Sequence, residues 1–303
     1  MMRYLTGRGP KRAVSVTMAV FLATIVLFGL YAARPAQAAI VTLVGAGDIA
    51  SCAYNRDEAT AKLLDNIAGT VFTTGDNAYP SGTSTQYQNC YDPTWGRHKT
   101  RTRPSPGNHN YATAGAAGYY QYFGAAAGPS GKGYYSYNRG DWHIVVLNSM
   151  CENIGGCSAT SPQAQFLRND LAANPRRCTL AYWHHPLFSS GQHGNNPNMR
   201  PAFQILYDNN ADLVINGHDH DYERFAPQTP SGTLDRSQGI REIVVGTGGA
   251  GLRPFATIRP NSQVRNANTW GVLKLTLTAD NYSWQFVPVA GKTFTDSGTT
   301  SCH

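Results

Sequence analysis

The sequence predicts an α/β fold with buried sheets, and two observations support that class. Short apolar runs rich in β-branched residues recur along the chain, and each ends at Gly, Asn or His. Between several of these runs lie segments that are compatible with helices. Alternation of strand, helix and strand is typical of sheets covered by helices. Segments 125–133 and 189–198, rich in Gly, Pro and Asn, are expected to be surface loops.

Six runs are predicted to contain strands: 40–48, 70–76, 142–149, 179–185, 211–220 and 241–249. Three segments are predicted to be helices: 57–67, 161–174 and 198–210. The second opens with Ser161-Pro162, a suitable cap and first-turn proline. Residues 270–289 alternate regularly and turn at 279–281, which predicts an antiparallel hairpin at the edge of a sheet. The aromatic segment 111–124 is expected to pack in the core, with a wall of the substrate pocket as the alternative.

Residues 1–38 are expected to be a secretory signal peptide. A basic start is followed by the uncharged stretch 13–30, and Ala36-Gln37-Ala38 predicts cleavage after Ala38. An uncleaved anchor is the alternative, because 18 uncharged residues could just span a bilayer. We therefore expect a secreted protein, extracellular or in the cell envelope, with no stable membrane span after cleavage. Residues 39–303 are long enough for a single domain with a sizeable core.

Charge and cysteine content narrow the function classes. The formal net charge of +7 falls to +2 without the five basic residues of 1–38, so nucleic acid is not expected as an obligatory partner. All six cysteines follow Ala38, which predicts three disulfides among fifteen possible pairings. Cys151 and Cys157 flank a short loop, and Cys302 is expected to tie down the chain end, with Cys178 as a candidate partner. The absence of a Cys-x-x-Cys pair argues against metal binding by cysteines.

Polar side chains follow five separate segments at points where strands are expected to end. Taken singly, each has a structural explanation, since Asp beside Gly is a common turn residue and a His-x-His pair is usually structural. In α/β folds, however, ligands gather at the carboxyl ends of strands. The convergence therefore predicts a metal site, with the candidates Asp48, Asp76, Asn108, His109, His184, His218 and His220.

Tyr79 lies three residues after Asp76 and has two interpretations. A buried packing residue is the ordinary one in a chain with 17 tyrosines. As a phenolate ligand it would require a strongly acidic cation such as ferric iron, because bound cations lower the pKa of their ligands.

Five motifs together resemble the calcineurin-like metallophosphoesterase superfamily: GD at 47–48, GDNAY at 75–79, GNH at 107–109, HHP at 184–186 and GHDHDYER at 217–224. The tyrosine of GDNAY is similar to that of the purple acid phosphatase branch. The resemblance implies a four-layer α/β/β/α double β-sandwich. No separate N-terminal β-domain of the large plant forms fits in this length.

The resemblance also implies a two-metal site. The first ion, expected to be Fe(3+), would take Asp48, Tyr79 and His220, with Asp76 bridging. The second, Fe(2+), Zn(2+) or Mn(2+), would take Asn108, His184 and His218. His184 is preferred over His185 because the family's ligand stands two residues before the proline.

His109 and His193 would face the substrate and stabilise phosphoryl oxygens or protonate the leaving group. Departures from the family pattern are Ala50 in place of a histidine, Gly194 where plant members often carry another, and Asn110 where an acidic residue is common. The implied function is hydrolysis of small-molecule phosphomonoesters by metal-activated water or hydroxide. A phosphodiesterase using the same centre is the alternative, and a non-catalytic secreted metal-binding protein is the alternative from another class.

Overall fold

The computed structural model describes residues 40–303 together with residues 5, 7, 9 and 10. The expected signal peptide and its cleavage site lie almost entirely outside the described residues. Over the part of the chain that the structure describes, no helix has the length and apolar character needed to cross a bilayer.

Within residues 40–303, two large sheets form the centre of the molecule. The six-stranded sheet has the order β15-β14-β13-β1-β3-β5. Strands β1, β3 and β5 are mutually parallel, and β13, β14 and β15 extend the sheet in antiparallel fashion. The bounds are β1 (Val41–Ala46), β3 (Thr70–Thr74), β5 (Thr102–Ser105), β13 (Gly271–Leu277), β14 (Asn281–Pro288) and β15 (Ser297–Ser301).

The second sheet has seven strands within the same residues, in the order β12-β10-β11-β9-β8-β7-β6. Its central strands β11, β9, β8 and β7 are parallel. The bounds are β6 (Tyr135–Arg139), β7 (Trp142–Val146), β8 (Cys178–Tyr182), β9 (Leu213–Asn216), β10 (Tyr222–Phe225), β11 (Arg241–Val245) and β12 (Ser262–Asn266). Two short strands, β2 (Ala50–Ser51) and β4 (Ala78–Tyr79), pair separately.

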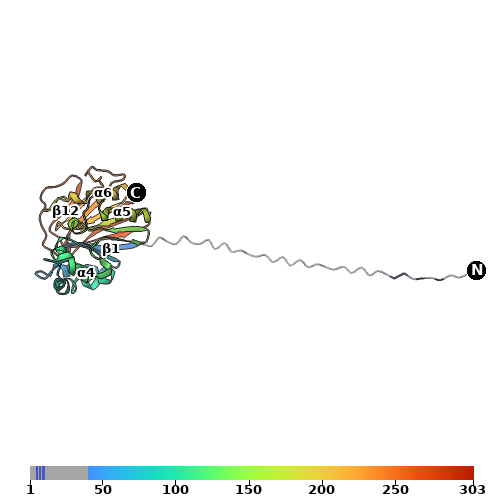
Figure 1. The fold of residues 1–303 in the computed structure, drawn as a ribbon, viewed down its shortest axis with the longest axis horizontal. Coiled ribbons are helices and arrows are strands. Elements are labelled where there is room, and N and C mark those ends of the chain that lie inside the picture. The colour runs from blue at the N-terminus through green and yellow to red at the C-terminus, as the bar shows by residue number, and fades with distance from the viewer. Residues whose placement is uncertain (1–4, 6, 8, 11–39) are drawn as a thin grey trace, which may run out of the picture. The chain divides into compact units, whose positions relative to one another are not determined.

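The two sheets pack face to face, and helices cover their outer faces (Figure 1). Alternate residues of the parallel strands point to opposite sides, as the strand period of two requires. Leu180 of β8 joins the core between the sheets, whereas Ala181 packs beneath the helices. Phe72 and Tyr182 meet across the sandwich, with ring centroids 5.7 Å apart. This arrangement confirms the predicted four-layer fold.

Helices α5 and α6 cover the seven-stranded sheet, and α1 contacts β13 of the other. The α-helices are α1 (Arg56–Asn66), α2 (Ser84–Gln86), α3 (Asn108–Tyr111), α4 (Ala117–Phe123), α5 (Pro162–Ala173) and α6 (Arg200–Asp208). A π-helical turn spans Tyr87–Tyr91, and 3₁₀ turns span Trp95–Arg101, Ala114–Ala116, Gly124–Ala127, Cys151–Asn153 and Pro197–Met199.

The three predicted helices and six predicted strands are confirmed. The Oγ of Ser161 accepts a hydrogen bond from the amide of Ala164, which makes it the N-cap of α5. Tyr119 and Phe123 of the aromatic segment are buried in the core, so packing is the correct interpretation there.

The hairpin of β13 and β14 is present, but the prediction that it forms the sheet edge is wrong. Strand β15 pairs with β14 and forms the edge instead. Its sequence, SGTTS, has no apolar alternation, so the pattern that predicts buried strands misses it.

The described part of the chain contains three disulfides and no free cysteine. They join Cys52 to Cys90, Cys151 to Cys157 and Cys178 to Cys302. The local pair and the pair that ties down Cys302 are therefore as expected.

Candidate metal centre

The parallel strands of both sheets deliver the candidate ligands to one place. Asp48 follows β1 and Asp76 follows β3, whereas His184 follows β8 and the two histidines of GHDH follow β9. Asn108 opens α3, shortly after β5. The carboxyl ends of strands from two facing sheets therefore converge, which is where α/β folds commonly bind ligands.

One group of donors surrounds the phenol of Tyr79. Its Oη lies 2.8 Å from Asp48 Oδ1, 3.3 Å from Asp76 Oδ2 and 3.2 Å from His220 Nε2. His220 Nε2 is 3.4 Å from Asp48 Oδ1. These are the four side chains that the resemblance assigns to the first ion.

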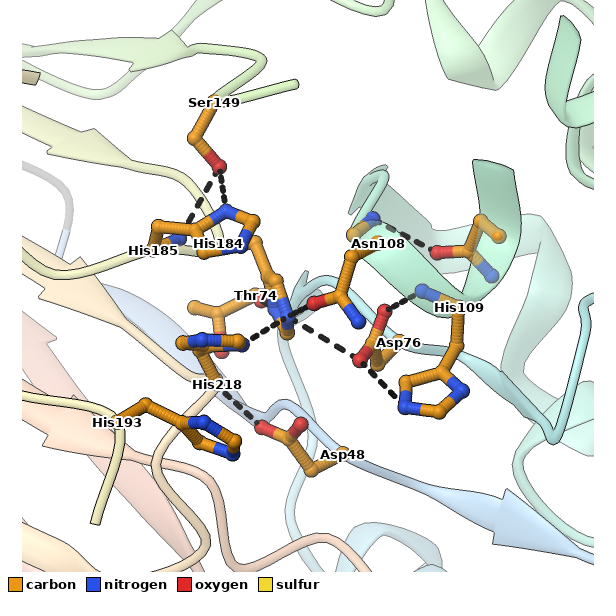
Figure 2. Close-up of polar contacts among 12 residues, drawn as sticks. Asp48, Thr74, Asp76, Asn108, His109, Ser149, His184, His185, His193 and His218 are labelled. Carbon is orange, nitrogen blue, oxygen red and sulfur yellow. Dashed lines mark hydrogen bonds and ion pairs between the residues drawn. The ribbon is translucent and has the colours of Figure 1, made fainter. Parts of the chain in front are cut away.

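A second group surrounds His184. Its Nε2 lies 3.0 Å from Asn108 Oδ1, 3.2 Å from His218 Nδ1 and 3.2 Å from Asp76 Oδ2 (Figure 2). The same Asp76 oxygen thus faces both groups. The structure brings all seven predicted ligands together, with Asp76 between the two sets.

The donor set fits a pair of cations. Asp48 and Asp76 are 0% and 1% exposed, and no Lys or Arg forms an ion pair with either among the described residues. Buried carboxylates are normally paired or bound to metal. Carboxylate, amide and phenol oxygens with imidazole nitrogens are suitable ligands for iron, zinc or manganese.

Backbone carbonyls orient two of the histidines. Nδ1 of His184 lies 2.8 Å from the carbonyl oxygen of Thr74, and Nδ1 of His220 lies 2.7 Å from that of Gly251. Because a carbonyl only accepts, each Nδ1 carries a proton and each Nε2 faces the centre.

Asp48, Asp76 and His218 adopt left-handed backbone conformations, with φ of 60°, 48° and 71°. Such angles are uncommon for residues other than glycine and cluster at functional sites. Hydrogen bonds hold them: the amide of Asp48 donates to Gly75 O at 3.1 Å, and that of His218 donates to Asp48 Oδ2 at 2.9 Å.

The glycines in the motifs make room for the carboxylates. A Cβ added at Gly107 would overlap Asp76 Oδ1, and one at Gly217 would lie 2.6 Å from Asp48 Oδ2. Glycine at positions 107 and 217 therefore allows the backbone to approach the carboxylates of Asp76 and Asp48 closely.

Electrostatic coupling in the centre is strong. Burial acts to raise the pKa of Asp76, yet neighbouring His184 holds that pKa down at about 2. Burial acts to lower the pKa of His184, but Asp76 raises it to about 9. A metal that binds Nε2 of His184 would therefore compete with a proton.

The phenol of Tyr79 is held in its neutral form. Burial and then the charge of Asp48 raise its pKa well above the ordinary value. Only a cation bound beside it would make the phenolate accessible.

His109 lies at the mouth of the centre. Its amide donates to Asp76 Oδ1 at 2.8 Å, its ring packs on Tyr79 at 4.3 Å, and its side chain is 33% exposed. His193 lies on the other side, where its ring stacks on His218 with centroids 4.3 Å apart (Figure 2). Both predicted substrate-facing histidines thus border the ligand set.

Sequence reasoning assigned no role to several residues that shape the site. His185 packs on His218 at 4.1 Å, and its Nδ1 lies 2.8 Å from Ser149 Oγ. Burial and the neighbouring His184 lower the pKa of His185 to about 3. The doubled histidine was the only local signal that could have indicated its proximity.

Asp219 organises the loop that carries His193. Its carboxylate accepts hydrogen bonds from the amide of His193 at 2.8 Å, the amide of Gly194 at 3.2 Å and the Oγ of Ser189. It stands between the two predicted ligands of GHDH, and the sequence analysis assigned it no role.

The fold and this donor set define an α/β double sandwich with a candidate metal site. The family model described as calcineurin-like phosphoesterase matches residues 41–222, and the chain belongs to this family. Purple acid phosphatase 15 of Arabidopsis thaliana is 28% identical over 233 residues, which cover 65% of this chain and 43% of that protein. Purple acid phosphatase 13 of the same plant is 35% identical over 126 residues, which cover 39% of this chain and 22% of that protein.

Solved structures support the fold. Purple acid phosphatase PPD1 from yellow lupin (Lupinus luteus) seeds aligns with a TM-score of 0.65 at 20% identity, over 88% of this chain and 55% of that one. GAP50, the anchor in the inner membrane complex of Plasmodium, aligns with a TM-score of 0.67 at 14% identity, over 87% and 89%. In sequence, the chain spans less than half the length of each of these two plant phosphatases.

Proposed function

We propose that this protein is a secreted dinuclear-metal phosphatase that hydrolyses phosphomonoesters by attack of metal-activated water or hydroxide. The observation that carries the proposal is the position of Asp76, whose Oδ2 faces both Tyr79 at 3.3 Å and His184 at 3.2 Å. A carboxylate that faces two groups of ligands can bridge two ions, whereas a single ion would require only one of these groups. Residues 39–303 would form the single catalytic domain.

Asp48, Tyr79, His220 and Asp76 would hold Fe(3+), and Asn108, His184, His218 and Asp76 would hold Fe(2+), Zn(2+) or Mn(2+). When bound, such a pair supplies Lewis acidity and lowers the pKa of water toward neutrality. The ferric assignment rests on Tyr79, whose phenol resists deprotonation without a strongly acidic neighbour.

The protein's own residues supply positioning and proton transfer. His109, tied through its amide to Asp76, borders the centre where it can protonate a departing alkoxide. The carbonyls of Thr74 and Gly251 keep two imidazoles directed inward. Disulfides in the described residues are consistent with export to an oxidising compartment.

A non-catalytic metal-binding role is the second candidate, because family membership alone does not guarantee activity. Purple acid phosphatase 9 of Arabidopsis thaliana, 27% identical over 168 residues, is named as probable inactive. Retention of the seven donors in one place favours the enzyme.

Assays of para-nitrophenyl phosphate and its bis ester, with and without chelator, test the proposal. We expect hydrolysis of the monoester by natively purified protein, and loss of activity with chelator. Asp76→Asn should lose bound metal and reduce kcat more than about 100-fold, since even partners of metal ligands cost 10–100-fold. Asp141→Asn, in the turn before β7 at the opposite end of the sheet, is the control. Full metal content without turnover of either ester would support the non-catalytic candidate.

A further inference from the structure

A loop that follows β11 brings one arginine to the rim of the centre. The amide of Arg253 donates to the carbonyl of His220 at 3.1 Å, and the carbonyl of Gly251 lies 2.7 Å from His220 Nδ1. The two residues that flank Leu252 are thus both hydrogen-bonded to His220, a predicted ligand. The backbone of Arg253 is therefore held beside the metal centre.

The side chain of Arg253 is also held in place. Its Nη1 lies 2.8 Å from His193 Nε2, and the His193 ring stacks on His218. A guanidinium only donates, so Nε2 of His193 is the acceptor and this imidazole is neutral with its proton on Nδ1.

The charge of Arg253 is not neutralised by the protein. Among the described residues, no carboxylate forms an ion pair with it, and its remaining guanidinium N–H groups have no acceptor. The Arg253 side chain is partly exposed, and it lies beside the side chains that we predict to bind the two cations. A fixed, unpaired guanidinium is a good partner for a phosphoryl oxygen.

We propose that Arg253 is a specificity-determining residue that binds a terminal phosphoryl oxygen and favours dianionic monoesters over diesters. This inference rests on the proposed function. A monoester has three terminal oxygens, whereas a diester has two and one fewer negative charge. The guanidinium would bind the additional terminal oxygen, which only a monoester or inorganic phosphate offers. His193 is then a positioning residue for Arg253 rather than a proton donor.

Arg253→Gln and Arg253→Lys test the inference beside Arg176→Gln. Arg176 is exposed and precedes β8, at the end of the sheet opposite to the centre, and its replacement removes the same charge. A hydrogen bond to a charged group is worth about 1.5–3 kcal/mol, so kcat/KM for para-nitrophenyl phosphate should fall about 10- to 150-fold in Arg253→Gln. The value for the bis ester should change less than about threefold, and Arg253→Lys should recover part of the loss.

Calorimetry gives a readout independent of turnover. Inorganic phosphate should bind Arg253→Gln about 10- to 150-fold more weakly than wild type, with dimethyl phosphate binding and metal content unchanged. Equal losses for both esters, an unchanged ester preference, or loss of metal would overturn the inference. If wild type binds metal but hydrolyses neither ester, the proposed function fails, and the phosphate isotherms still decide the role of Arg253. Absence of phosphate binding to wild type would overturn it.

Discussion

Asp48, Asp76 and His218 share left-handed backbone angles, and all three are predicted ligands. Residues in this region cost about 1–3 kcal/mol each and persist where their surroundings hold them. Here the surroundings include one another, since Asp48 Oδ2 accepts from the amide of His218 at 2.9 Å. At the residue scale, hydrogen bonds within the site therefore hold the predicted ligands in position.

Tyr79→Phe is the most direct test of the ferric assignment. The substitution keeps the ring that packs on His109 and removes only the oxygen that lies 2.8 Å from Asp48. We expect any visible charge-transfer band of natively purified protein to disappear. Tyr111→Phe, which loses a hydroxyl outside the ligand set, should leave the spectrum unchanged. An unaltered band in Tyr79→Phe would exclude phenolate ligation.

Gly107→Ala tests the close approach of backbone to ligand. The added Cβ would overlap Asp76 Oδ1 and lie 2.6 Å from the amide nitrogen of Asp76. We expect weaker metal binding and a loss of about 1–3 kcal/mol in unfolding free energy, as overpacking typically causes. Gly291→Ala is the control for metal binding, because an added Cβ there would meet no atom within 4 Å and its backbone strain, at φ 81°, lies outside the ligand set. Titration with the metal measures both variants, and equal affinities would contradict this account.

At the element scale, the loop that follows β8 is anchored by a strand beside it. Glu242 of β11 accepts hydrogen bonds from the amides of Leu187 at 2.9 Å and Phe188 at 3.1 Å. These residues come shortly after His184, so Glu242 helps to set the path of the chain that leaves the ligand. Complete burial raises the pKa of this carboxyl to about 8.

The raised pKa of Glu242 predicts a pH-dependent stability. Between pH 4.5 and 8 the folded state keeps a proton that the unfolded state releases, so rising pH favours unfolding. This contribution is fully present below pH 4.5 and declines by up to about 1.4 kcal/mol per pH unit through the window.

Urea unfolding in the presence of chelator measures the effect. The unfolding free energy of wild type minus that of Glu242→Gln should fall as pH rises from 4.5 to 8, because glutamine cannot titrate. Chelator removes the contribution of bound metal. A difference that is constant with pH would show that Glu242 has an ordinary pKa.

At the scale of the whole molecule, disulfides differ in how much chain they enclose. Cys178–Cys302 closes a loop with a sequence separation of 124, whereas Cys151–Cys157 has a separation of 6. Loop-closure entropy predicts contributions of about 5 and about 2 kcal/mol respectively. The long bond joins the start of β8 to the segment after β15 and thus links the two sheets.

Paired alanine replacements test this difference. Cys178→Ala with Cys302→Ala should lower the unfolding free energy by about 5 kcal/mol, and Cys151→Ala with Cys157→Ala by about 2 kcal/mol. Denaturant titration under chelator compares them at equal metal content. A larger loss for the short loop would contradict the entropic account.

The sequence by itself determined the class of fold and indicated which side chains are candidate metal ligands. A buried strand followed by a carboxylate or histidine, in most cases after a glycine, is a local pattern, so Asp48, Asp76, His184 and the two histidines of GHDH are recognisable without coordinates. The edge strand β15 was not predicted, because its residues are small and polar and lack the apolar pattern of a buried strand. Backbone pairing with β14, a hydrogen bond between the hydroxyls of Thr299 and Ser283, and the adjacent disulfide of Cys302 hold it.

Only the tertiary structure decided which donor side chains lie in the same group and which residues surround each group. The amide of His218 meets Asp48 across 170 residues, and Arg253 meets His193 across 60. Such contacts arise where the two sheets and their loops pack together, and no periodicity in the chain encodes them. Local pattern therefore indicates which side chains can bind a metal, whereas packing sets the position of Asp76 between two groups and directs Arg253 toward the rim.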